Sequence, residues 1–211
     1  IQDHVNRLPD RLQFWADHPH WARWRWNRPY RWATWAAMTS WFPWGWSEPS
    51  HYYYGDNIYY EGDTVYYGDE AYGSTEEYAA QAQDIATSAP QDIPDDTEWM
   101  TLGVFALTQD GQSAGVDPTI YLQLAVSKDG IIAGTAHNME TDETVAVEGM
   151  VQRETQRAAW VVTGKTSPIM ETGIHNLTED EAPALLHFSD GQTQQWLLIR
   201  LEEPEGEGQS K

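Results

Sequence analysis

Residues 99–203 alternate between apolar and polar or small side chains with a period of two, which is typical of strands whose two faces differ. The alternation is clearest in residues 120–126, 145–151 and 158–162. The connections between apolar runs are short and contain Asp-Gly pairs, which favour tight hairpins and pairing of each strand with the next. We therefore predict an antiparallel up-and-down β-barrel of about eight strands, at 99–108, 119–127, 131–137, 143–153, 157–163, 168–174, 184–188 and 193–202.

The interior of this barrel should be apolar, because one face of each strand must turn away from water. We expect it to include apolar positions from separate strands, namely Leu122, Leu124, Val147, Trp160 and Trp196. The strands and turns should make one core without help from the residues that precede them.

The first fifty residues show a different pattern, of short helical segments separated by prolines. Behind Pro29, Trp32 and Trp35 begin an i, i+3, i+4, i+7 pattern that continues to Thr39. Pro43 should end this helix, because proline cannot continue it without losing a hydrogen bond.

Residues 51–73 contain a repeat with a period of seven. Gly55-Asp-Asn-Ile-Tyr-Tyr60 recurs as Gly62-Asp-Thr-Val-Tyr-Tyr67, and each copy is a turn followed by a β-branched and aromatic strand. We predict a Tyr-rich β-hairpin that turns near Gly62. A two-stranded hairpin is marginal alone, so another surface should cover it.

Ser74 and Glu77 form a capping-box signature that opens a helix over residues 74–86. An acidic, Pro-containing linker follows, and the Gly- and Glu-rich end of the chain should be disordered. The predicted organisation is a Trp/Arg-rich helical arm (1–50), a Tyr-rich hairpin (51–73), a helix with an acidic linker (74–98), an antiparallel β-domain (99–203) and a tail (204–211).

Charge separates the arm from the rest of the chain. Residues 1–50 hold six Arg against four acids, a net of +2, whereas residues 51–211 hold six Lys or Arg against twenty-nine acids, a net of −23; the two sum to −21. This balance argues against nucleic-acid binding, which rests on neutralising phosphates, and against docking of the body on anionic lipid. The chain has no cysteine, which excludes disulfides, thiolate zinc sites and cysteine nucleophiles.

Several short motifs suggest chemistry only weakly. Gly164-Lys-Thr166 resembles the end of a phosphate-binding loop but lacks the earlier glycine of that motif. The Gly-Asp turns could offer carboxylates to calcium, and Asp17-His-Pro-His20 could offer two imidazoles to a metal, but neither supplies enough convergent ligands. His137, His175 and His187 lie in predicted strands and could meet at a barrel mouth. We expect no catalytic residues, no metal site and no cofactor.

Aromatic rings and arginines near the N-terminus are the strongest candidates for binding, because Trp, Tyr and Arg are enriched at interface hot spots. Three interpretations stay open: burial against this protein or a partner subunit, stacking on carbohydrate, and contact with a membrane interface. The longest uncharged run, residues 32–47, is too short to span a bilayer. The candidate partner-binding residues are Trp24, Trp26, Arg28, Trp32, Trp35, Trp41, Trp44, Trp46, Tyr53, Tyr59 and Tyr66.

Four stretches carry a resemblance to a known group: residues 28–35, the Gly-Asp-x-Ile/Val-Tyr-Tyr repeat, residues 99–107 and residues 193–200. Together they resemble exported planctomycete proteins labelled mu-protocadherin-like cell-surface proteins, over nearly the whole chain. The resemblance implies an extracytoplasmic, envelope-associated location and no chemistry. Separately, residues 134–162 are similar in rhythm to avidin- and lipocalin-like barrels, which is an analogy of fold alone.

We therefore predict a mainly β, non-enzymatic extracytoplasmic structural or assembly protein of the cell envelope or cell surface. Its aromatic arm and hairpin would pack against a partner chain or an envelope component. The expected partners are other protein subunits, in a homo- or hetero-oligomer, with glycan as a further candidate, no nucleic acid, and membrane contact that does not span the bilayer. The alternative is a module that binds glycan or a small ligand with exposed aromatics or the barrel mouth. The start at Ile1, without a leader-like segment, indicates a processed or partial chain.

Overall fold

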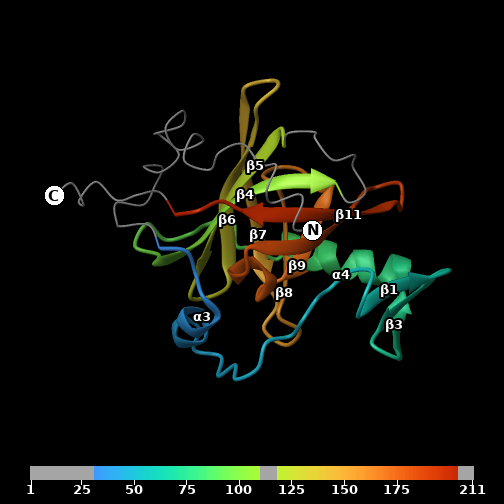
Figure 1. Cartoon of the computed structure of the whole chain (residues 1–211). Coiled ribbons are helices and arrows are strands. Elements are labelled where there is room, and N and C mark those ends of the chain that lie inside the picture. The colour runs from blue at the N-terminus through green and yellow to red at the C-terminus, as the bar shows by residue number, and fades with distance from the viewer. Residues whose placement is uncertain (1–30, 110–117, 204–211) are drawn as a thin grey trace.

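Figure 1 shows a computed structural model of the chain, which describes residues 31–109 and 118–203. The predictions for Trp24, Trp26, Arg28 and the tail lie outside the described residues. Within the described part, a β-barrel carries a small sheet and two α-helices on its surface.

The barrel confirms the predicted fold class. Each of its strands pairs antiparallel with the next in the sequence, and the last pairs with the first to close the barrel. Closure leaves no sheet edge exposed, so its backbone hydrogen bonds are satisfied around the wall. The strands are β4 (Trp99–Gln109), β5 (Ile120–Ser127), β6 (Ile131–Asn138), β7 (Glu143–Val151), β8 (Arg157–Val162), β9 (Ile169–Gly173), β10 (Glu181–His187) and β11 (Thr193–Arg200).

One strand departs from its predicted bounds by three residues, and the others agree with theirs to within two. β10 begins at Glu181, three residues before the strand expected at 184–188, and the preceding turn is a short 3-10 helix, η1 (Asn176–Thr178). Pro183 lies within β10 and pairs with Leu197 of β11. Proline is unusual in a strand interior, because it cannot donate a hydrogen bond to the ladder, so residue type favours a strand that starts after Pro183.

The inward faces of the strands fill the barrel with apolar side chains. Of the five core residues predicted, all except Trp196 are buried in one cluster, and Trp196 packs against that cluster while staying partly exposed. Met38 and Phe42, which precede the barrel, are buried in the same cluster. The core therefore includes residues of the arm, and the expectation that the β-domain folds without them stays a prediction.

Helix α3 (Trp35–Trp41) supplies these residues and lies at one end of the barrel (Figure 1). The Thr34 hydroxyl accepts a hydrogen bond from the Ala37 amide and caps its first turn. The helix therefore begins later than predicted, and Trp32 lies before it. The Trp32 indole instead donates to the Leu201 carbonyl at 2.7 Å, and its amide donates to Glu203 at 2.8 Å.

The Tyr-rich repeat forms a small sheet of three strands, β1 (Ile58–Glu61), β2 (Thr64–Tyr67) and β3 (Glu70–Ser74). The predicted hairpin turn at Gly62 is present, with Gly62 in a left-handed conformation that glycine adopts without strain. The third strand adds to the two that the repeat predicts. Ile58 and Val65 are buried against Leu185 of the barrel wall, which supplies the cover that a hairpin needs.

Helix α4 (Thr75–Thr87) follows directly, and its capping box between Ser74 and Glu77 confirms the prediction. Its side chains Ala82 and Ile85 pack against Ala159 and Val161 on the outer face of β8. The small sheet and α4 together make an outer layer on one side of the barrel (Figure 1).

Candidate functional site

The tryptophans of the arm gather over the end of the barrel that α3 closes. We call Trp35, Trp41, Phe42, Trp44 and Trp46 the aromatic cap. Trp35 and Trp46 stack with ring centroids 6.0 Å apart, Phe42 and Trp44 stack at 4.2 Å, and Trp44 meets Trp46 edge-on at 4.9 Å. Offset-stacked and edge-to-face pairs are the favourable geometries for such rings, so the cap is held together by its own contacts.

Three turns at the same end of the barrel fix the cap in place. The Lys128 ammonium lies 5.0 Å from the Trp41 ring, in the turn between β5 and β6. The Trp46 indole donates to the Arg153 carbonyl at 3.0 Å, in the turn between β7 and β8. Trp35 packs edge-on against His175, which follows β9, at 5.2 Å.

The cap is anchored but not fully covered. Phe42 is buried, whereas Trp35, Trp41, Trp44 and Trp46 pack against the barrel core and remain partly exposed. These four tryptophans therefore present a rigid aromatic surface at one end of the molecule.

Two of the predicted tyrosines, Tyr59 and Tyr66, lie elsewhere, on the outer face of the small sheet. Tyr59 and Tyr66 are paired across β1 and β2, and their half-exposed rings stack at 5.2 Å with planes 7° apart. Tyr53 precedes the small sheet, stacks on the ring of His51 and is 41% exposed. We call Tyr59, Tyr66 and the exposed carboxylates of the turns around them the tyrosine face. Six of the eight candidate residues that the structure describes thus form two surfaces, one at the end of the barrel and one on its side.

A buried charged cluster, which sequence reasoning missed, lies beneath the small sheet. The Arg157 guanidinium donates to Glu171 from Nε at 3.0 Å and from Nη2 at 2.5 Å, and both side chains are fully buried. His187 Nε2 lies 2.9 Å from the other Glu171 oxygen. Arg157 also donates to the Tyr78 carbonyl and to Gln81 of α4, so the cluster joins the barrel wall to the outer layer.

Tyrosine rings enclose this cluster. Arg157 stacks 3.9 Å from the Tyr78 ring, and the buried Tyr54 and Tyr78 hydroxyls have no hydrogen-bond partner among the described residues. Burial raises the pKa of Tyr54 and Tyr78, and likewise that of Tyr52 and Tyr60. Burial alone would lower the pKa of Arg157, but the charge and hydrogen bonds of Glu171 outweigh it and raise that pKa. The cluster is therefore closed to solvent. We call it the clamp, because Arg157 joins Glu171 of the barrel wall to Tyr78 and Gln81 of α4.

The sequence carried a partial signal for this clamp. Strand alternation places Arg157, Glu171 and His187 on the outward faces of β8, β9 and β10, so their side chains point away from the barrel interior. The register that brings them together could not be read from the pattern, because Arg157 is paired with Gly173 and Glu171 with Ala159. Arg157 and Glu171 meet only diagonally across the two strands.

The three strand histidines do not converge, contrary to the hypothesis of a joint site. His137 and His187 face outward near one end of the barrel, and His175 follows β9 at the other end. Burial lowers the pKa of His175; Glu179, 3.4 Å away, opposes this shift, and His51 adds to it. Within residues 31–109 and 118–203, no group of three His, Asp or Glu side chains could hold a metal ion.

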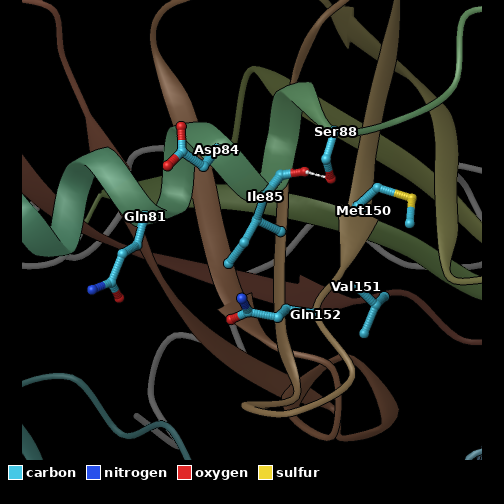
Figure 2. Close-up of a pocket in the computed structure, with 7 residues that line it drawn as sticks. All are labelled: Gln81, Asp84, Ile85, Ser88, Met150, Val151 and Gln152. Atoms are coloured by element: carbon cyan, nitrogen blue, oxygen red, sulfur yellow. Dashed lines mark hydrogen bonds between the residues drawn. The ribbon is translucent and has the colours of Figure 1, made fainter.

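A shallow hollow lies between α4 and the end of β7 (Figure 2). Its volume is about 240 Å³, smaller than the usual 300–1,000 Å³ of sites for drug-sized ligands. The Ser88 hydroxyl at its rim is engaged with the Ile85 carbonyl at 2.8 Å, and Asp84 is its one charged lining residue. Its lining residues are Gln81, Asp84, Ile85, Ser88, Met150, Val151 and Gln152.

Comparisons with known proteins identify no relative of this chain. No protein family, no curated protein and no solved structure matches the chain. In the part of the chain that the structure describes, no helix is long and apolar enough to cross a membrane.

Proposed function

We propose that this chain is a non-enzymatic, extracytoplasmic structural or assembly protein whose aromatic N-terminal half joins the barrel to a partner chain or an envelope component. The observation that carries the proposal is the aromatic cap. Its four tryptophans are fixed by the barrel core and its turns, yet each keeps part of its ring exposed. Rigid aromatic side chains offer large contact area at little cost in conformational entropy, as interface hot spots do.

The arrangement of the rings favours protein contact over sugar stacking. A carbohydrate platform needs ring faces that lie side by side and open to solvent. Trp35 and Trp46 instead stack face to face at 11°, and Tyr59 and Tyr66 do so at 7°. One face of each ring is thereby covered in part by its neighbour. The resemblance of the sequence to exported cell-surface proteins supports the proposed location.

The alternative is a small-ligand module at the barrel mouth opposite the cap. It has one supporting observation: the interior residues Ile120, Val162, Leu186 and Trp196 near that end are only partly buried. The Trp196 indole and the Gln109 amide both donate to Gln194 there, which leaves polar groups beside apolar ones. Mouths of β-barrels with this mixture are common ligand sites.

Sedimentation velocity separates the two functions. The full chain and a variant in which the partly exposed cap residues Trp41 and Trp44 are replaced by Ala are compared at low salt and at 1 M NaCl. We expect the full chain to associate and the variant, shown to be folded by circular dichroism, to be monomeric. The association should weaken but persist at 1 M, where the Debye length is about 3 Å, because aromatic burial is not screened. Identical monomers under all conditions would contradict the assembly role and favour the ligand-binding alternative.

A further inference from the structure

The tyrosine face belongs to a segment of the chain that carries only negatively charged side chains among its Asp, Glu, Lys and Arg positions. Residues 51–98 contain nine of the eleven tyrosines and twelve Asp or Glu, with no Lys or Arg. On the outer face of the small sheet, the stacked Tyr59 and Tyr66 rings are bordered by exposed carboxylates in the turns at both ends of the strands. These carboxylates are Asp56, Glu61, Asp63, Asp69 and Glu70. The segment supplies no cation of its own to this surface.

The sequence contains one segment with the opposite chemistry. Residues 21–28, Trp-Ala-Arg-Trp-Arg-Trp-Asn-Arg, alternate indoles with three guanidinium groups. Guanidinium groups bind carboxylates through charge-assisted hydrogen bonds and stack on aromatic faces. The clamp beneath the sheet shows the same combination, since Arg157 contacts both the Tyr78 ring and the Glu171 carboxylate.

We propose that residues 21–28 of one copy of this chain bind the tyrosine face of a second copy. This inference rests on the proposed assembly role and adds a contact between copies that is separate from the aromatic cap. The arginines pair with the turn carboxylates, and the indoles pack beside the stacked tyrosines. Such a contact joins two different surfaces, so it links copies head to tail.

The position of Arg31 and Trp32, the first residues that the structure describes, indicates that residues 21–28 make this contact with another copy. Two residues separate Arg28 from Arg31, and the three steps along the chain between these arginines span about 10 Å at most. The adjoining Trp32 is held near β4, by Leu201 and Glu203, and Ala33 donates to the Thr101 carbonyl.

The small sheet lies too far away for this tether. Its inner face packs on Leu185 of β10, which is two strands further round the barrel than β4, and its outer face is one layer further out. At about 4.8 Å per strand and about 10 Å per layer, each displacement alone is about the length of the tether. Figure 1 shows the start of the described chain and the small sheet on opposite sides of the barrel. Residues 21–28 therefore cannot all lie on the tyrosine face of their own chain, because Arg28 does not reach it.

A labelled peptide of residues 19–30 tests the contact directly. Fluorescence anisotropy measures its binding to the chain that lacks residues 1–30. We expect saturable binding that weakens at least about tenfold in the double variant Glu61→Lys, Asp63→Lys. The matched control is Glu140→Lys, Glu143→Lys, which makes the same change of charge at exposed positions around the turn between β6 and β7. It should bind as tightly as the unchanged protein.

Each of the other possible results of these binding experiments would contradict the proposed contact. Equal weakening in both variants would mean non-specific attraction to an acidic protein and would overturn the proposal. Absence of binding to a chain shown to be folded by circular dichroism would do the same. Peptide binding that is blocked in a monomeric full chain would place the contact within one copy. If the full chain associates but the Glu61→Lys, Asp63→Lys variant associates equally well, the arm assembles through another surface, which leaves the proposed function standing without this inference.

Discussion

Glu171 is a carboxylate with no exposed surface, and its charge is balanced by Arg157 and hydrogen-bonded to His187. Replacing Glu171 by Gln preserves its shape but leaves the guanidinium charge of Arg157 buried without compensation. We expect the free energy of unfolding to fall by about 3–5 kcal/mol, as for other buried pairs that lose one partner. Urea denaturation measures the loss.

Asp84→Asn on the exposed side of α4 is the matched control, because it removes one carboxylate charge from the helix that Arg157 joins to the barrel wall. Its effect should stay within about 0.5 kcal/mol, since exposed substitutions away from such clusters change stability little. If Glu171→Gln were no more destabilising than Asp84→Asn, the clamp would not bear on folding.

At the scale of single residues, the sequence predicted what lies inside the barrel better than what lies against its outside. The apolar positions of the strands alternate, and that alternation decides which side chains face inward. The partners of an outward residue depend on strand register and on the layer above it. This is why Trp160 could be placed in the core, whereas the meeting of Arg157, Glu171 and Tyr78 could not be foreseen.

The outer layer has a pH dependence set by its buried tyrosines. Burial raises the pKa of Tyr52, Tyr54, Tyr60 and Tyr78 above the ordinary value near 10. The folded state therefore holds these protons more tightly than the unfolded state. Their contribution to stability is complete below about pH 10 and is lost as the pH rises further.

An alkaline titration tests this expectation. Absorbance at 295 nm follows phenolate formation, and circular dichroism follows the fold. We expect part of the phenolate signal to appear only as the fold is lost, because the enclosed phenols ionise on unfolding. In concentrated urea all eleven tyrosines should titrate together near pH 10. Complete ionisation near pH 10 with the fold intact would show that these rings are open to water.

At the scale of elements, local signals served well where they were complete. Ser74 and Glu77 contain the whole capping box, and α4 begins where they predict. The boundaries that failed depend on distant contacts. The sequence pattern places Trp32 within the arm helix. That residue is instead held by Leu201 and Glu203, which are distant in the sequence, so α3 starts only after the Thr34 cap.

At the scale of the molecule, the barrel is closed along its wall and the N-terminal half covers it at one end and on one side. Short connections and alternation predicted the closed barrel. They could not predict that the arm would complete its core, because nothing local marks Met38 and Phe42 as the side chains that fill that end. The two surfaces left open, the aromatic cap and the tyrosine face, follow from this wrapping.

Stepwise shortening of the chain from its N-terminus tests whether α3 contributes to the stability of the barrel core. A chain that starts at residue 31 keeps α3 and the whole described core, whereas one that starts at residue 51 loses Met38 and Phe42, which are 0% and 4% exposed. Truncating a buried Met side chain costs about 2–5 kcal/mol and a buried Phe about 3–5 kcal/mol, so the second chain should be less stable by at least about 5 kcal/mol. At about 2–4 °C per kcal/mol for this size, its melting temperature in scanning calorimetry should fall by about 10 °C or more. Both shortened chains lack residues 1–30, so association through that segment cannot explain the difference. Equal melting temperatures for the two would mean that the barrel closes its own core and that α3 merely rests on it.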